Sequence, residues 1–333
     1  MAGSRPTMED VAARASVSRA LVSIVFRGVP GASEQTRQRV LTAAAELGYE
    51  TDRRASRLGR SRTRMIGVVF DFSGDFHAHV IDGLYRSADE HDYEVVLSPA
   101  TPHRSERQAI ASVLGERCEG IVLIGPRIAS TEIADLSRRM ATVVLLRQVR
   151  AAGVDSIRTD DQAGLDLLVD HLAGLGHREI RYVDGGEAAG ASPRRTAYRR
   201  AMARLGLTPQ TLAGGMDEEA GAVAAELLLG EASVSLPSAI VAFNDRCALG
   251  ILHRLRGAGL HLPGDLSLTG FDDIAAAGYR HNALTTVHQD TTALGALAMD
   301  RLRARIEDDG APGTRLLVPP RLVHRKTTAA PPL

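Results

Sequence analysis

The chain has 333 residues, 44% of them hydrophobic, and its 40 basic residues balance its 40 acidic residues. This length exceeds what one hydrophobic core usually organises, so two or three domains are expected. No apolar run approaches the roughly 18–20 residues of a membrane-spanning helix, no signal peptide is recognisable, and only two cysteines occur, far apart at Cys118 and Cys247. These features exclude a membrane protein and a disulfide-rich secreted domain, and predict a reduced, cytoplasmic protein.

The neutral total hides an uneven distribution of charge. Residues 1–64 hold 12 arginines and 6 acidic residues, a formal charge of +6, while the rest of the chain holds 28 basic and 34 acidic residues, a charge of −6. Lys326 is the only lysine, so contacts to phosphate or guanine would come from planar arginine side chains. A basic head on an acidic body is typical of a DNA-binding tip.

Three short helices are predicted in residues 1–48. Thr7 and Asp10 fit a capping box that opens the first helix. Ser18 is the expected N-cap of the second helix and Ser33 that of the third. A bundle of this kind could also serve only for protein contacts, but that alternative leaves the basic excess unexplained.

The turn between the first two predicted helices is very short, Ser16-Val17. Helices joined by so tight a turn place the second helix in a DNA major groove, where its first side chains meet base edges. Arg19 and Ala20 occupy those positions. The head is therefore predicted to be a helix-turn-helix.

The head as a whole, TMEDVAARASVSRALVSIVFRG followed by ASEQTRQRVLTAAAELGYE, resembles the lactose-repressor (LacI/GalR) family of transcriptional regulators. Ser16 stands where the family usually has glycine, which costs about 1 kcal/mol if the backbone there is left-handed. Ile24 stands where the founding member has a base-reading arginine, so a different operator sequence is expected. The resemblance implies DNA contacts in the head by Thr7, Ser18, Arg19, Ala20, Ser23 and Arg27.

Residues 49–64 form a basic linker, with six arginines between residues 50 and 64. Asp52 can cap a helix that begins at Arg53, but with Gly59 near its end this helix is too short to be stable alone. A solvated, flexible linker is the alternative interpretation. The segment is expected to fold only on DNA.

The resemblance gives this linker a specific role. It implies a hinge helix that pairs with its dimer mate and inserts a leucine between base pairs in the minor groove, which kinks the duplex. Leu58 matches that leucine, and Arg54 and Arg57 are the accompanying DNA contacts. Thr51 stands where the family often has proline, so the start of this helix is less rigidly set.

From residue 65 onward, short β-branched runs such as MIGVVF, EGIVLIG and SAIVAFND alternate with helical stretches. This alternation predicts parallel sheets covered on both faces. The pattern resembles the periplasmic-binding-protein-like core of the same family, an α/β core of two doubly wound lobes, with a long helix from Thr291 to Asp308 and one last strand. The expected core spans residues 65–330, with lobe one at about 65–161 and 289–318 and lobe two at about 162–288 and 319–330.

Ligands of open parallel sheets bind beyond the carboxyl ends of the strands. The resemblance implies a small-molecule effector at this position, between the lobes, with contacts from Phe76, His77, Arg147, Arg194, Asn244, Asp272 and Gln289. Carboxyl, amide and guanidinium groups suit a sugar or polyol, and two inward arginines would also suit a sugar-like acid. Non-functional alternatives remain for several of these residues: Asp245 and Asp272 as helix caps, Phe72 and Phe76 as core or lobe-interface residues, Arg194 on a solvated helix face, and a carboxylate partner for Arg147.

These expectations describe a transcriptional repressor that binds operator DNA as a homodimer or higher oligomer, at the nucleoid, with no cofactor. An enzyme is the rival of a different class, with Asp160-Asp161 and Asp272-Asp273 as paired carboxylates. Adjacent strand residues point to opposite faces, which weakens that reading. The glycine-rich DGGEAAGAS matches neither a phosphate loop nor a dinucleotide fingerprint. A second rival is a regulator whose core only dimerises.

Overall fold

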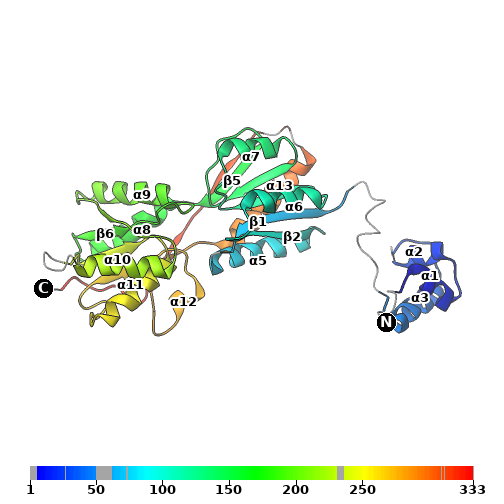
Figure 1. The fold of residues 1–333 in the computed structure, drawn as a ribbon, viewed down its shortest axis with the longest axis horizontal. Helices are drawn as coiled ribbons and strands as arrows, with labels where there is room; N and C mark the ends of the chain where they lie inside the picture. The colour runs from blue at the N-terminus through cyan, green and yellow to red at the C-terminus, as the bar shows by residue number, and fades with distance from the viewer. Residues whose placement is uncertain are drawn as a thin grey trace. The chain divides into compact units, whose positions relative to one another are not determined.

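The fold was examined in a computed structural model, which describes residues 6–26, 28–49, 62–72, 74–230, 236–308, 310 and 312–332. The chain divides into two compact units, Met1–Thr63 and Arg64–Leu333, and each is described by itself (Figure 1). Within the described residues, no helix combines the length and apolar character that crossing a membrane requires.

The described residues of the first unit form the helices α1 (Met8–Ala15), α2 (Arg19–Phe26) and α3 (Glu34–Leu47). The capping box predicted at the start of α1 is present, since Asp10 N donates to Thr7 Oγ1 and Thr7 N donates to Asp10 Oδ2. The helices enclose a small core of valines and alanines, which includes Val11, Val22 and Val40. This packing supports a rigid helical head.

The turn of the head has the left-handed backbone that glycine would favour. Ser16 ends α1 with φ 53° and ψ 50°, the conformation that costs a non-glycine residue about 1 kcal/mol. Arg39 of α3 holds this turn, because its Nη2 donates to the carbonyl oxygen of Ala15 at 2.9 Å. The third helix therefore fixes the angle at which the chain enters α2.

Lobe one of the second unit is a six-stranded, all-parallel sheet of order β11-β5-β4-β3-β1-β2. One face of the sheet packs on α5 and α13, and the other packs on α6 and α7, so the sheet is doubly wound. Its elements are β1 (Met65–Asp71), α5 (Asp75–Glu90), β2 (Glu94–Ala100), α6 (Glu106–Gly115), β3 (Gly120–Ile124), α7 (Ser130–Ser137), β4 (Ala141–Leu145), β5 (Val154–Thr159), α13 (Thr291–Glu307) and β11 (Arg315–Val318).

Lobe two is a four-stranded parallel sheet of order β7-β6-β8-β9. Helices α8 and α9 pack on one face, and α10 and α11 on the other. Its elements are α8 (Asp161–Gly174), β6 (Ile180–Val183), α9 (Ala191–Arg204), β7 (Gln210–Leu212), α10 (Glu218–Gly230), β8 (Ala239–Ala242), α11 (Asp245–Gly257), β9 (Ser267–Thr269) and α12 (Ala275–Gly278), with an added antiparallel pair, β10 (Thr286–His288) and β12 (Arg321–Val323).

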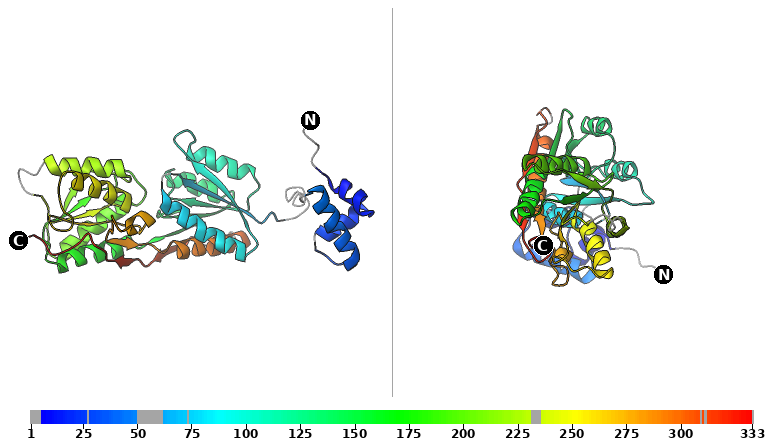
Figure 2. Two further views of the ribbon diagram at one scale, coloured as in Figure 1. Left: turned by 90° about the horizontal axis from the view of Figure 1, so that it is seen from below. Right: turned by 90° about the vertical axis from the view of Figure 1, so that its left-hand side faces the viewer.

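The chain passes from one lobe to the other between β5 and α8, between β10 and α13, and between β11 and β12. In Figure 2 the red C-terminal segment can be followed along this crossing. The single last strand expected from the sequence is thus two strands in different sheets. They are separated at Pro319-Pro320, and proline cannot donate a ladder hydrogen bond.

Strand β5 is not among the apolar runs that predicted the other strands, because its sequence VDSIRT lacks a continuous apolar run. Its Asp155 is fully buried. Arg305 donates to Asp155 Oδ2 at 2.8 Å and Arg301 donates to the same oxygen at 3.2 Å. Both arginines belong to α13, so an ion-pair cluster between distant segments permits a carboxylate inside the sheet.

Candidate functional site

A pocket of about 100 Å³ lies between the two lobes, lined by residues that follow the carboxyl ends of strands in both sheets. Six of the seven expected effector contacts line it: Phe76, His77, Arg194, Asn244, Asp272 and Gln289. The strand-end rule therefore brings these residues together as expected, although they are spread over more than half of the chain.

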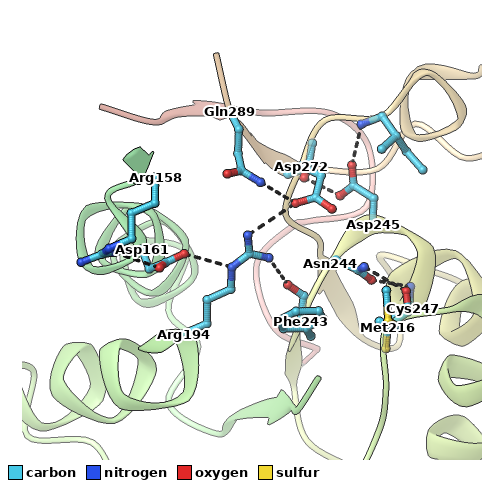
Figure 3. A network of polar contacts seen from close by, with 12 residues as sticks. Arg158, Asp161, Arg194, Met216, Phe243, Asn244, Asp245, Cys247, Asp272 and Gln289 are labelled. Carbon is cyan, nitrogen blue, oxygen red and sulfur yellow. Dashed lines mark hydrogen bonds and ion pairs between the residues drawn. The ribbon is translucent and has the colours of Figure 1, made fainter. Parts of the chain in front are cut away.

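Arg194, in the first turn of α9, is the buried centre of the pocket wall (Figure 3). Its Nε donates to Asp161 Oδ1 at 3.1 Å, and its Nη1 donates to the carbonyl oxygen of Phe243 at 2.8 Å. Its Nη2 lies 3.6 Å from Asp272 Oδ1. The guanidinium is thus bound on three sides by groups from three segments of lobe two.

The same guanidinium stacks on aromatic rings. Its Cζ lies 3.7 Å from the ring centroid of Phe271 and 5.0 Å from that of Phe243, distances at which a cation is attracted to a ring face. Burial by itself lowers the pKa of Arg194, but Asp272 and Asp161 outweigh it and raise that pKa above its ordinary value. Arg194 therefore remains a fixed positive charge.

Asp272 is also held by Gln289, whose Nε2 donates to the same Asp272 Oδ1 at 2.7 Å. Burial raises the pKa of Asp272 to about 6, although Arg194 acts in the opposite direction. The backbone here is unusual, with φ 122° at Asp272 and 57° at Asp273. Two successive non-glycine residues in this region indicate local strain of the kind found at binding sites.

Asn244 and Asp245 have separate roles at the start of α11. Asn244 is the N-cap, because its Oδ1 accepts from Cys247 N at 2.9 Å, while its Nδ2 donates to the carbonyl oxygen of Met216 at 2.9 Å. Asp245 is not the cap. It is fully buried and accepts from Thr286 Oγ1 at 2.5 Å and from Ile274 N at 2.9 Å, and burial raises its pKa to about 7.

The lobe-one side of the pocket is formed by the first turn of α5. His77 Nδ1 donates to the carbonyl oxygen of Asp71 at 2.9 Å, and burial lowers the pKa of His77. Phe76 packs against the hydrophobic cores of both lobes. A change in the mutual angle of the lobes would therefore directly alter the packing around Phe76.

In the head, Ser18, Arg19 and Ala20 are exposed at the start of α2. Ser18 Oγ accepts from Leu21 N at 3.2 Å, so it also caps the helix. Thr7 is exposed with its hydroxyl bonded to Asp10, and Ser23 is half-buried. The remaining expected DNA contacts lie outside the described residues: Arg27, Arg54, Arg57 and Leu58.

Residues 7–52 match the model of the bacterial regulatory proteins of the lacI family, and residues 169–328 match the periplasmic binding protein-like domain. Catabolite control protein A of Priestia megaterium is 30% identical, over 97% of this chain and 99% of its own length. The chain belongs to the LacI family. The α/β core of two doubly wound lobes behind a helix-turn-helix head, predicted from the sequence, is confirmed.

Solved structures of LacI-family regulators agree with this assignment. The lac repressor dimer bound to operator and the anti-inducer ONPF superimposes with a TM-score of 0.84 at 27% identity, over 98% of this chain and 100% of that one. The complex of the transcriptional regulator CelR with cellobiose gives a TM-score of 0.72 at 27% identity, over 97% of this chain and 100% of that one. The LacI family comprises DNA-binding transcriptional regulators, so this chain is a regulator of transcription.

Arg147 is the expected LacI-family contact that the structure does not bring to the pocket. Its Nη1 donates to the carbonyl oxygens of Pro126 and Ile128 at 2.9 and 2.6 Å, and its Nη2 donates to Ser130 Oγ at 3.1 Å. The preceding Leu146 lines the pocket instead, with φ 63°. The left-handed turn at Leu146 directs Arg147 away from the pocket.

The comparison of the sequence with the LacI family pattern did not predict several of the residues that line the pocket. They come mainly from the ends of β3 and β5 and from α11, and they include Arg127, Arg158, Thr159 and Arg246. Arg158 Nη1 donates to Asp161 Oδ2 at 3.1 Å, so the Asp161 carboxylate lies between Arg158 and Arg194 (Figure 3). Recognition of VDSIRT as a strand would have predicted this group, since Arg158 and Thr159 end that strand.

Proposed function

We propose that this chain is a repressor whose affinity for operator DNA is set by a small polar molecule bound between the two lobes. The observation that carries the proposal is the pocket itself, where Phe76 and His77 of lobe one face Arg194, Asp272 and Gln289 of lobe two. A few converging polar groups on an apolar lining are typical of a small-molecule site. The proposed contacts are the six pocket residues predicted from the sequence, and Arg147 is left out because its donors are used elsewhere.

The proposed control mechanism follows from where the pocket lies. A ligand that contacts both lobes is held fully only at one mutual angle of the lobes, so its binding selects that angle. Residues 49–64 would carry this change to the helix-turn-helix through a hinge helix that forms on DNA, with Leu58 as the wedge. A tenfold to hundredfold preference of the ligand for one state, about 1.4–2.7 kcal/mol, is enough to shift operator occupancy usefully. The expected sign is release from the operator.

The proposed DNA interface is the start of α2. Ser18, Arg19 and Ala20 lie there exposed, which supports direct contact with base edges in the major groove. Thr7, Ser23, Arg27, Arg54 and Arg57 complete the proposed contact set. With its basic head and its two buried free thiols, the protein is proposed to act in the cytoplasm at the nucleoid.

A homodimer is the proposed DNA-binding form. The lac repressor that this chain resembles is a dimer on its operator. Strand β2 is an edge strand of the lobe-one sheet, and Leu97 on β2 and Tyr85 on the neighbouring α5 are 40% and 38% exposed. Exposed apolar side chains beside an unpaired strand edge support a contact with a second copy.

Selection of binding sites from random DNA duplexes with the full-length chain tests the DNA-binding part of this proposal. We expect a pseudo-palindrome with two half-sites about one helical turn apart, or a multiple of that spacing. A selected site with a single, non-symmetric half-site would contradict the dimer. A thermal-shift screen of sugars and polyols tests the ligand-binding part, because a core that only dimerises would not be stabilised by any of them.

A further inference from the structure

Arginines are the most numerous charged residues around the pocket. Its lining includes the arginines Arg127, Arg158, Arg194 and Arg246 and the carboxylates Asp71, Asp161 and Asp272. A pocket for neutral polyols needs donors and acceptors but not four guanidinium groups.

Two of these arginines line the pocket while each donates to a carboxylate. Arg127 donates through Nη2 to Asp71 at 2.7 Å, and Arg158 donates through Nη1 to Asp161 at 3.1 Å. A guanidinium carries five N–H donors in a planar fork that matches a carboxylate or phosphate. Each arginine can therefore bind an anionic oxygen while it keeps its present partner. Arg194 is different, because Asp161, Asp272 and the Phe243 carbonyl already hold it.

The N-terminus of α5 lies at the pocket. The N-cap residue is Gly74, which makes no side-chain cap; the first helical residue, Asp75, is an exposed acid that does not line the pocket, whereas the next two, Phe76 and His77, do. The first N–H groups of a 16-residue helix form a partial positive charge that attracts anions. Arg246 of lobe two reaches this point, since a Cβ on Gly74 would lie 3.6 Å from its Cδ and 3.7 Å from its Nη1.

A buried hydroxyl supplies an independent sign of a ligand. Thr159 lines the pocket beside Arg158, is 2% exposed, and its Oγ1 has no hydrogen-bond partner among the described residues. Buried hydroxyls are nearly always paired, and an unpaired one costs about 1–3 kcal/mol. An oxygen of a bound molecule at this place would satisfy it.

There is space next to the pocket for a charged substituent of a bound ligand. A second cavity of about 570 Å³ shares Asp71, Gly125, Arg127, Met216 and Arg246 with the pocket. The two cavities are therefore adjacent and separated by shared side chains, two of which are arginines. A ligand whose hydroxyl groups occupy the pocket could place an anionic group beside Arg127, which lines both cavities.

We propose that the effector is an anion, a polyhydroxylated molecule with a carboxylate or phosphate group bound by Arg127 and Arg158 beside the N-terminus of α5. The proposal rests on the proposed function, because it concerns the ligand of the same pocket. It narrows the ligand class from sugars, polyols and sugar-like acids to sugar acids and sugar phosphates.

Matched pairs of compounds test the proposal with the full-length chain at constant ionic strength. The pairs are gluconate and glucitol, glucose 6-phosphate and glucose, and ribose 5-phosphate and ribose, with inorganic phosphate as the bare group. We expect the anionic member of at least one pair to bind at least tenfold more tightly by isothermal titration. An equal or higher affinity for every neutral member, or no binding by any anionic member, would overturn the proposal.

Two variants show whether the preference for anions comes from the pocket or from the basic head. Both leave the sequence of the head unchanged. Arg158→Gln should reduce the preference for the anionic member, measured as the ratio of the two dissociation constants in the same variant, to less than threefold. Arg204→Gln removes an exposed arginine that pairs with Asp166 and Asp170 and lines neither cavity, and it should keep the wild-type preference. An unchanged preference in Arg158→Gln would contradict the assigned site.

The failure of this proposal is distinguishable from the failure of the proposed function. If only neutral compounds bind and they change operator affinity, the anion inference is wrong and the regulator remains. If compounds bind the pocket and operator affinity does not respond to any of them, the proposed control mechanism is wrong, whatever the charge of the ligand.

Discussion

Arg194 and Asp161 form a buried pair, with Nε and Oδ1 3.1 Å apart and side chains that are only 9% and 10% exposed. The pair joins the first turn of α9 to the first residue of α8. Asp272 lies on the other side of the same guanidinium. Arg194 thus compensates two buried carboxylates and organises the wall of the pocket.

Arg194→Ala is therefore expected to lower the free energy of unfolding by about 3–5 kcal/mol, because it leaves Asp161 and Asp272 without this partner. Urea denaturation of the full chain, followed for the core transition, measures the change. Arg200→Ala removes an exposed arginine from the same helix and should stay within about 0.5 kcal/mol of wild type. Equal effects of the two substitutions would contradict the central role of Arg194.

The stability of the core is expected to fall as the pH rises from about 4 to 7. Burial raises the pKa of Asp245 to about 7 in the folded chain from an ordinary value of 3.8. In this window the folded state binds the proton that the unfolded state has released, so each rise in pH favours unfolding. Asp272, with its pKa raised to about 6, acts in the same direction.

Asp245→Asn tests this pH dependence. From pH 5 to pH 7 the wild type should lose about 2 kcal/mol more unfolding free energy than the variant, because one pKa unit corresponds to about 1.4 kcal/mol. Asp170→Asn, an exposed carboxylate paired with Arg204, should follow the wild type. Parallel curves for Asp245→Asn and wild type would show that Asp245 is charged at both pH values.

Ser16→Gly is expected to stabilise the head by about 0.5–1 kcal/mol, since glycine adopts the left-handed backbone of this turn without strain. Amide hydrogen exchange in α1 and α3 of the full chain should slow accordingly. Ser33→Gly removes an N-cap whose φ is −66°, so it should speed exchange slightly. Faster exchange in Ser16→Gly would mean that the serine side chain has a stabilising role in the turn.

Arg19→Ala is expected to relax base preference at one position of each operator half-site, at a cost of about 1–3 kcal/mol for the preferred base. Arg19 is exposed at the first position of α2, with Glu9 3.6 Å from its Nη1. Binding selection with the variant measures the preference position by position. Arg107→Ala, which removes an exposed arginine of α6 outside the head, serves as the control. A uniform loss over all sequences would indicate a phosphate contact instead.

The features that were predicted correctly are those determined by residues close together in the sequence. The capping box of α1 and the strand ends that carry Asn244 and Asp272 follow from neighbouring residues, and the sequence predicted them. Strand β5 depends on Arg301 and Arg305 of α13, which make the burial of Asp155 possible. No pattern within VDSIRT contains that information.

The position of Arg147 away from the pocket has a similar cause. A strand-end position predicts that a side chain lies near the ligand edge of the sheet, but its direction depends on the backbone of the turn. Leu146 has φ 63°, which is uncommon for leucine, and so Leu146 faces the pocket while Arg147 binds the Pro126 carbonyl. Arg158 was missed because its strand was missed.

The central claim, that the mutual angle of the lobes controls operator binding, can be tested without knowledge of the effector. Gly125 follows β3 in lobe one, and Ala189 precedes α9 in lobe two. A Cβ on Gly125 would lie 3.5 Å from the Cβ of Ala189, within the range of about 3.5–4.5 Å found in disulfides. Gly125→Cys with Ala189→Cys can therefore link the lobes across the pocket, and the native Cys118 and Cys247 are buried.

The decisive measurement is the operator Kd of this double variant, oxidised and reduced, with both single variants as controls for the strain that a side chain causes at Gly125. If the lobe angle controls the head, oxidation should change the Kd at least tenfold, about 1.4 kcal/mol, and abolish any response to ligand. A reductant should restore both, and the single variants should not respond to oxidation. The same operator Kd in the oxidised and reduced double variant would contradict the account.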